Sequence, residues 1–187
     1  MLLLLSIPIG LVAGYLTGGR FSRLVHRHFR WTFLIPIAVL IQFLIFPWFF
    51  RAPLFPYATS ALHLLSYVLV GVWLAANLRF RPMVVIGVGA LCNLAVIAAN
   101  GGRMPASEAA LRAAGAFVEA DALVEGGTVA NVILMSETTR LNWLGDILHV
   151  PSWMPFATAF SIGDAILFLG LVWLIAKGMK DEGKESQ

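Results

Sequence analysis

The chain has 187 residues, of which 59% are hydrophobic and only 12% are charged. A soluble domain usually carries about 25% charged and about 45–50% apolar residues, so this composition argues against an ordinary soluble protein and favours one buried in lipid. The net charge of +3 does not indicate a nucleic-acid partner, because the basic residues form short clusters between apolar segments, as membrane topology signals do. The length predicts a single domain.

Five apolar segments approach the length of about 20 residues that a helix needs to cross a bilayer. They cover residues 2–17, 31–50, 60–78, 83–99 and 156–176. No basic residue precedes the first segment, whereas a cleaved signal peptide begins with one, so we expect this segment to be retained as a helix. The pattern predicts an all-α, polytopic membrane protein with about five transmembrane helices, in the cytoplasmic membrane of a bacterium.

The distribution of basic residues predicts how the chain is oriented. Nine lie in the first and third connections and the tail: Arg20, Arg23, Arg27, Arg30, Arg79, Arg81, Lys177, Lys180 and Lys184. The other connections hold four: Arg51, Arg103, Arg112 and Arg140. Cytoplasmic loops carry the excess of lysine and arginine, so we expect the N-terminus outside and the C-terminus inside. Residues 1–176 then form one transmembrane domain with an extracytoplasmic loop at 100–155, and residues 177–187 form a polar cytoplasmic tail.

The long loop at 100–155 has room for structure outside the bilayer. Residues 107–121 are rich in alanine and predict a helix that Ser107 can cap, and Gly126 and Gly127 then interrupt the chain. Residues 128–140 are ambiguous between a strand and a helix start. Trp143 and Trp153 suit the headgroup level of a membrane.

Asp164 is the clearest candidate for a functional residue. It lies in the last apolar segment, roughly 12 Å below its start at 1.5 Å per residue, where burying a charge in lipid costs about 2.5–3.5 kcal/mol. Ser161 shares its helix face, and Gly163 and Gly170 let a neighbouring helix approach. The alternative is a carboxyl that only hydrogen-bonds another helix.

Asp146 stands in LGD, a pattern that Asp164 repeats as IGD. The chain between them turns at Pro151 and Pro155, so the two carboxyls can return to one place at the outer boundary. Two close carboxyls do not both ionise readily; one keeps its proton while the other acts as a base on water. The pair would then hydrolyse an amide or ester without a metal. The alternative is that Asp146 caps a turn.

Further polar residues are expected near this outer boundary. Asn100 and Asn93 form a polar stripe on the fourth segment, and Arg103 is placed to hold a phosphate, a carboxylate or an aspartate. A helix C-cap with a solvent-facing arginine explains Asn100 and Arg103 equally well. His63, near the outer end of the third segment, is a further candidate for contacting the substrate, or a hydrogen-bonded packing residue.

The sequence predicts no metal site and no cofactor. His149 follows Asp146 by three residues, but no third ligand stands at a useful spacing. The single cysteine, Cys92, excludes an internal disulfide.

Three motifs, NGGRMP at 100–105, LGD at 144–146 and SIGDAILFLG at 161–170, resemble an uncharacterised bacterial family of small membrane proteins, a domain of unknown function. Residues 160–170 are also similar to the last-helix motif of lipoprotein signal peptidase (signal peptidase II). That resemblance implies that Asp164 and Asp146 match its catalytic aspartates and that Asn100 contacts substrate. Ser161 and Gly163 depart from the motif, which has asparagine and alanine there.

We therefore expect a membrane-embedded hydrolase of the aspartic type, with Asp146 and Asp164 as the catalytic residues. Asn100, Arg103, Ser161, His63 and Asn93 would bind the substrate. The substrate would be a lipid-anchored or membrane-inserted peptide that enters from the outer leaflet, so membrane lipid and such a peptide are the expected partners. The alternative is a non-enzymatic binding or assembly module, or a small carrier of a lipid or ion, with structural aspartates. The sequence leaves the oligomeric state open.

Overall fold

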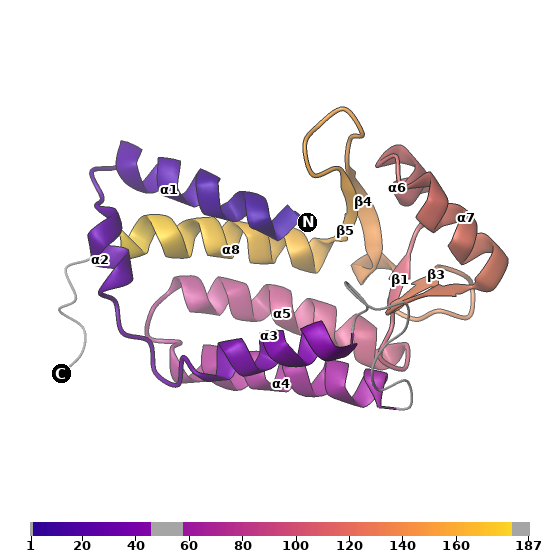
Figure 1. The fold of residues 1–187 in the computed structure, drawn as a ribbon, viewed down its shortest axis with the longest axis horizontal. Coiled ribbons are helices and arrows are strands. Elements are labelled where there is room, and N and C mark those ends of the chain that lie inside the picture. The colour runs from indigo at the N-terminus through magenta and orange to yellow at the C-terminus, as the bar shows by residue number, and fades with distance from the viewer. Residues whose placement is uncertain (1, 46–57, 181–187) are drawn as a thin grey trace.

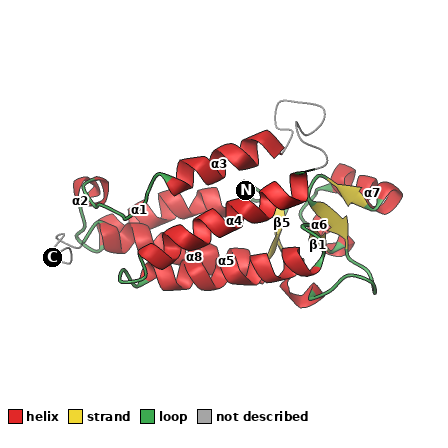
Figure 2. Cartoon of the chain, turned by 90° about the horizontal axis from the view of Figure 1, so that it is seen from below, coloured by secondary structure: helices red, strands yellow, loops and turns green. Residues whose placement is uncertain are grey.

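The computed structural model describes residues 2–45 and 58–180 (Figure 1). A layer of long helices forms most of the molecule, and a small sheet with two short helices lies at one end of that layer. In chain order the helical elements of the layer are η1 (Leu2–Leu5), α1 (Ser6–Leu16), α2 (Phe21–Val25), α3 (Leu34–Ile45), α4 (Thr59–Ala76), α5 (Pro82–Ala99) and, last, α8 (Ile162–Gly178). Helix α8 packs between α1 and α5, while α4 packs between α5 and α3 (Figure 2).

Glycines allow α5 and α8 to approach closely. A Cβ atom added at Gly89 would lie 2.7 Å from the carbonyl oxygen of Gly163, and one at Gly170 would lie 2.7 Å from the Ile86 side chain. Small residues at a helix interface let two backbones come together without leaving a void. The predicted role of Gly163 and Gly170 as contact points for a neighbouring helix agrees with this packing.

The end domain is built from the long loop. Its elements are β1 (Met104–Ala106), α6 (Glu108–Ala113), α7 (Phe117–Gly126), β2 (Thr128–Val129), β3 (Val132–Leu134), η2 (Asn142–Leu144), β4 (Asp146–Val150) and β5 (Thr158–Ser161). The strands form one sheet in the order β2-β3-β1-β4-β5. The central strand, β1, is parallel to both of its neighbours, and the two outer pairs are antiparallel.

Two apolar clusters hold the end domain in place. One, between the sheet and helices α6 and α7, contains Ala106, Leu111, Ala120 and Leu123. The other contains Val96, Ile97, Met104 and Leu144, and it joins the end of α5 to the start of the sheet. The sheet is therefore packed onto the helical layer at the place where α5 ends and α8 begins.

The prediction of an all-α, polytopic fold is wrong. The protein is mixed α/β, because residues 104–161 contain a five-stranded mixed sheet. Within residues 2–45 and 58–180, only α5 is long and apolar enough to cross a membrane, with 18 residues and a mean hydropathy of 2.2. Helices do occupy much of each predicted segment. The apolar helices described in the first two segments are shorter than α5 (Leu2–Leu16 and Leu34–Ile45), and the apolar stretch of α4 covers Ala61–Ala76. The start of the fifth segment forms β5 instead.

The reasons for these differences are local. The strands have only two to five residues each, too short to show an alternating pattern. The predicted helix at 107–121 breaks at Gly115, which has a φ of +79°, so it becomes α6, capped by Ser107, and α7. The ambiguous stretch at 128–140 contains β2 and β3. Outside the described residues lie 46–50 of the second segment, Arg51, and residues 181–187 of the predicted tail, which include Lys184. The start of that tail is helical, since α8 continues to Gly178.

Basic residues gather at the end of the helical layer that lies opposite the sheet. The main-chain N–H of Arg20 donates to Met179, and the Arg23 guanidinium donates to the carbonyl of Lys180. Arg27 and Lys177 both lie over the Phe80 ring, at 4.1 and 5.3 Å from its centre. Three basic clusters that are far apart in the sequence are therefore neighbours around α2, at the left of Figure 1.

Candidate aspartyl site at the start of the last helix

Ser161 marks the point where β5 ends and α8 begins. Its backbone is still extended, with φ −92° and ψ 167°, and its hydroxyl accepts a hydrogen bond of 2.9 Å from the main-chain N–H of Asp164. In return, the N–H of Ser161 donates to Oδ2 of Asp164 at 3.2 Å. This reciprocal capping satisfies two N–H groups that a helix start otherwise leaves without partners. It also fixes the Asp164 carboxyl beside the strand.

Asn93 on α5 completes the arrangement. Its Nδ2 donates to Oδ1 of Asp164 at 2.7 Å, and its Oδ1 accepts from the Ser161 hydroxyl at 2.9 Å. Asn93 and Ser161 are buried, with 3% and 0% of their surface exposed. Both oxygens of the Asp164 carboxyl therefore accept hydrogen bonds, from Asn93 and from Ser161, which hold it in one orientation as an acceptor.

Asp146 reaches the same place from the neighbouring strand. It pairs with Ser161 in the β4–β5 ladder, and the register shifts between Asp146 and Leu148. Such irregularities redirect side chains and are common next to functional sites. Its Oδ1 is buried and has no hydrogen-bond partner among the residues that the structure describes.

The environment of Asp146 favours its protonated form. Burial raises the pKa of the Asp146 carboxyl, the negative charge of Asp164 raises it further, and Glu119 on α7 adds to the effect, so that the pKa reaches about 7. Burial disfavours a charged carboxylate, and a second negative charge nearby disfavours it again. At neutral pH the site thus combines a carboxyl that can give up a proton with an oriented carboxyl that accepts hydrogen bonds.

Tyr67 on α4 is a member of this site that the sequence analysis did not select. Burial raises the pKa of its hydroxyl, and the negative charges of Asp164 and Asp146 raise it further. Its ring packs edge-on against His63, with 5.2 Å between ring centres, and contacts the cluster of Val96 and Met104. Tyr67 follows His63 by four residues and so shares its helix face, which is the one signal in the sequence that relates the two.

His63 is buried in the contact between α3 and α4. Its Nδ1 lies 3.3 Å from Nε2 of Gln42, and Gln42 also donates to the hydroxyl of Ser66. Ser66 donates in turn to the carbonyl of His63. His63 is thus joined to the aspartyl site through Tyr67.

Asn100 and Arg103 lie at the end of α5. Nδ2 of Asn100 donates to the carbonyls of Val96 and Arg140, each at 2.8 Å, and its Oδ1 accepts from the N–H of Arg140 at 2.9 Å. Asn100 therefore ties the long connection after β3 to the end of α5. Arg103 is exposed just before β1.

The described part of the chain contains no group of three or more histidine, cysteine, aspartate or glutamate residues arranged to hold a metal ion. His149 lies on β4 opposite Ala159 and is exposed. The chemistry that this site offers is proton transfer between two carboxyls in different environments, together with hydrogen bonding from an amide and two hydroxyls.

Fold and site define a mixed α/β protein in which an apolar helical layer carries a polar end domain, with two aspartates where they meet. Residues 26–176 match DUF5317, a family of unknown function, and the chain belongs to this family. That agrees with the predicted membership of an uncharacterised family. No curated protein and no solved structure matches, so the resemblance to signal peptidase II stays a prediction.

Proposed function

We propose that this protein is a hydrolase of the aspartic type that acts on a lipid-anchored or membrane-inserted substrate. One observation carries the proposal: Oδ1 of Asp146 is buried without a hydrogen-bond partner among the described residues, and Asp146 pairs with Ser161, whose N–H donates to the Asp164 carboxyl. A pair of acids whose surroundings separate their proton affinities is the arrangement that acid–base hydrolysis needs. The likeness of residues 160–170 to the last helix of signal peptidase II also supports it.

The proposed reaction adds one water across an amide or ester. The Asp164 carboxylate takes a proton from a water molecule as the oxygen of that water attacks the carbonyl carbon of the substrate. At the same time the Asp146 carboxylic acid gives its proton to the carbonyl oxygen. In the second step, the C–N or C–O bond breaks, Asp164 passes its proton to the leaving group, and Asp146 recovers a proton from the intermediate. Both residues return to their starting states. Asn93 and Ser161 keep Asp164 in position throughout.

The other predicted residues have less direct roles. Arg103, exposed beside β1, is the candidate for holding a polar group of the substrate. Asn100 and His63 support the backbone and the α3–α4 contact next to the site. No cofactor takes part.

A membrane location is part of this proposal. Many large apolar side chains on the helices are exposed, among them Val12 (57%), Leu40 (59%) and Leu91 (64%). Exposed apolar surface of this extent is typical of contact with lipid or with another protein. We place α5 across the cytoplasmic membrane of a bacterium, with the end domain on the outer side, because the basic residues gather at the opposite end.

The experiment that tests the function uses purified protein in phosphatidylcholine vesicles and a library of N-palmitoylated, internally quenched peptides. Cleavage by the wild type in H₂¹⁸O should place ¹⁸O in the new carboxyl group, and Asp146→Asn and Asp164→Asn should each reduce turnover at least a hundredfold. Glu125→Gln, at an exposed position on α7, serves as the matched control and should cleave as the wild type does. Cleavage at the wild-type rate by either aspartate variant would exclude the mechanism.

The non-enzymatic alternative has one observation in its favour, the apolar groove described below, which a lipid carrier would also need. A carrier predicts that the wild type binds the palmitoylated peptides without cleaving any of them. It also predicts that both aspartate variants bind them as tightly as the wild type does.

A further inference from the structure

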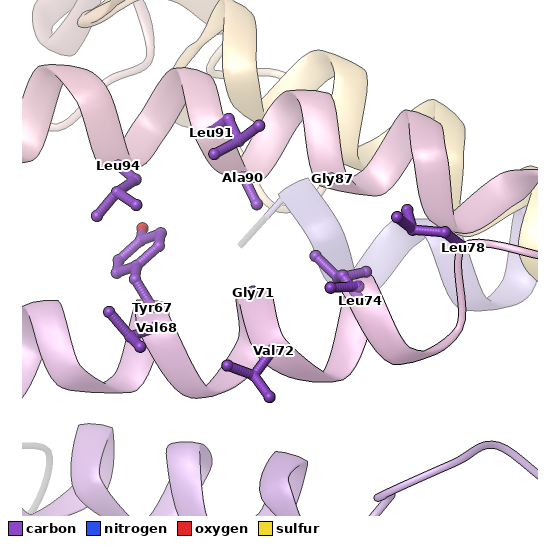
Figure 3. A pocket seen from close by; sticks show the side chains of 11 residues that line it. Tyr67, Val68, Gly71, Val72, Leu74, Leu78, Gly87, Ala90, Leu91 and Leu94 are labelled. Atoms are coloured by element: carbon purple, nitrogen blue, oxygen red, sulfur yellow. The ribbon is translucent and has the colours of Figure 1, made fainter.

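A groove of about 440 Å³ opens between α4 and α5 (Figure 3). Its walls include Val68 and Val72 from α4 and Leu91 and Leu94 from α5, and Tyr67 supplies the only polar side chain among the residues that line it. The volume lies within the range of about 300–1,000 Å³ that is usual for ligand sites. None of the described residues that line the groove is charged, so a charged or strongly polar ligand would lose its hydration there without compensation.

Two glycines make the groove. Gly71 on α4 and Gly87 on α5 both line it, and a Cβ atom added at either would meet no other atom within 4 Å. The glycines at the α5–α8 contact are the opposite case, since Gly89 and Gly163 have no space for a Cβ. The open space at Gly71 and Gly87 is therefore room that the fold leaves unfilled, not a close helix contact.

The shape of the groove fits an extended chain. The part of α4 that lines it, from Tyr67 to Ala75, extends over roughly 12 Å at 1.5 Å per residue. A single hydrocarbon chain, whose carbons pack about 4 Å from their neighbours, fits this space.

One end of the groove leads to the aspartyl site. Figure 3 shows the Tyr67 ring pointing from α4 toward α5, with its hydroxyl beside Leu94. Tyr67 also packs against the cluster that contains Leu144, which lies two residues before Asp146. Tyr67 therefore stands between the apolar groove and the two carboxyls, and a chain lying in the groove would end next to them.

We propose that the groove between α4 and α5 binds the acyl chain of an acylated peptide, with Tyr67 at the boundary between the chain and the bond to be cleaved. This inference rests on the proposed hydrolase function and selects the lipid-anchored substrate over an unmodified membrane-inserted peptide. The chain would lie along Val68, Val72 and Leu91, and the Tyr67 hydroxyl would face the polar part of the substrate.

The test uses an N-palmitoylated tetrapeptide whose acyl chain carries a diazirine, present at low mole fraction in phosphatidylcholine vesicles that contain the full-length protein. After irradiation, mass spectrometry should find the label concentrated on α4 and α5 around Tyr67, Leu91 and Leu94. An excess of unlabelled palmitoylated tetrapeptide should remove this label, whereas additional bilayer lipid should not.

Matched glycine variants make the test specific. A Cβ at Gly71 or Gly87 meets nothing within 4 Å, so Gly71→Leu and Gly87→Leu extend a side chain into the groove, and each should reduce labelling at least fivefold. Gly126→Leu, on α7, is the control, since a Cβ there also meets nothing within 4 Å, and it should label as the wild type does. Circular dichroism and the thermal midpoint of each variant check that it is folded.

The outcomes separate this inference from the proposed function. Label spread evenly over the apolar faces of α1, α3 and α4, or undiminished in the folded Gly71→Leu and Gly87→Leu variants, overturns the groove as the acyl site. Equal competition by an unacylated hydrophobic peptide overturns it as well. If the Asp164→Asn variant is still labelled and the wild type cleaves no peptide, the groove is the acyl site and the proposed hydrolase function is wrong. If Gly87→Leu cleaves at the wild-type rate, the hydrolase function stands and the groove is not the acyl site.

Discussion

Asp146 lies directly opposite Ser161 in the β4–β5 ladder, and Ser161 is the residue that caps α8. Since the capping is reciprocal, the main-chain N–H of the same serine also donates to the Asp164 carboxyl. A strand pairing and a helix cap thus bring together two carboxyls from different elements, without requiring any hydrogen bond between them. The position of each depends on secondary structure and not on a flexible loop, which is the kind of support that a precise site needs.

The first prediction concerns the coupling of the two carboxyls. Replacing Asp164 by Asn removes a negative charge near Asp146, so the pKa of Asp146 should fall below about 7. The pKa of Asp146 should remain above its ordinary value of 3.8, because burial is the largest cause of the upward shift and the substitution leaves the carboxyl buried. Carbon-13 NMR of aspartate-labelled protein over pH 3–9 measures this value.

Glu119→Gln provides the comparison for that experiment. Glu119 also raises the pKa of Asp146, but by less than Asp164 does, so its removal should lower the pKa by a smaller amount. An equal effect of the two substitutions, or none from Asp164→Asn, would show that the charges of the two aspartates do not interact.

The second prediction is a pH dependence of stability. The pKa of Asp146 is about 7 in the folded protein and about 3.9 in an unfolded chain, so the folded state binds this proton more tightly. Its contribution to stability is fully present below pH 4 and is lost as the pH rises through about 7. Three pKa units correspond to at most about 4 kcal/mol.

Asp146→Asn should remove this dependence, because an amide does not titrate. The variant should gain stability relative to the wild type as the pH is raised from 4.5 to 8.5, which thermal unfolding at several pH values measures. Glu125→Gln, on an exposed part of α7, should run parallel to the wild type. A constant difference between Asp146→Asn and the wild type across this range would contradict the raised pKa.

Parts of this structure follow from its sequence and parts do not. The apolar helices were predictable because apolar residues continue over a long stretch of the sequence. Asp164 was predictable as a candidate because a carboxyl among apolar residues is conspicuous. The sheet could not be predicted, because β1 pairs in parallel with β3 and β4, which are distant in the sequence, through only one to three residues each. Asp146 was selected because its LGD motif resembles the IGD motif that contains Asp164. Its approach to Asp164 depends on the β4–β5 register.

Tyr67 and the role of Asn93 show a second limit. A tyrosine on an apolar helix gives no sign that the charges of two carboxyls on other elements act on it until the helices are packed. Asn93 was expected to bind substrate, and that role stays a prediction. The structure adds that its amide bonds both Asp164 and Ser161. Contacts between residues that are about 70 positions apart depend on which helices are neighbours, and local patterns do not determine that.

The third prediction assigns Asn93 a positioning role. Asn93→Ala removes the donor to Asp164 and the acceptor for the buried Ser161 hydroxyl, so it should cost about 1–3 kcal/mol of stability. It should also lower kcat at least tenfold with a smaller change in KM, because Asp164 loses its fixed orientation. Its pH–rate profile should change shape as well, which a purely structural loss would not cause.

Asn142→Ala is the matched control, since Asn142 also bonds through its amide, to Ser136 and Thr139, but in the connection before β4. This variant should keep the wild-type pH–rate profile. If the Asn93→Ala variant has the wild-type kcat, Asn93 does not position Asp164 for catalysis.

The fourth prediction compares two glycines that face different surroundings on neighbouring helices. A Cβ at Gly163 would collide with Oδ1 of Asn93 and lie 2.9 Å from the carbonyl oxygen of Gly89, whereas a Cβ at Gly87 meets nothing within 4 Å. Gly163→Ala should therefore destabilise the protein by about 1–3 kcal/mol, the usual cost of overpacking. Gly87→Ala should stabilise it by about 0.5–1 kcal/mol, because alanine loses less backbone entropy in a helix.

The same pair distinguishes damage to the site from damage to the fold. Displacing Asn93 pulls its amide away from Asp164, so Gly163→Ala should lose activity even at temperatures where circular dichroism shows it fully folded. Gly87→Ala adds only one methyl group to the groove, too little to fill it, and it should remain folded to a higher temperature than the wild type. Equal thermal midpoints for the two variants would mean that α5 and α8 are not in close contact at Gly163, and the hydrogen bonds that join Asn93, Ser161 and Asp164 depend on that contact.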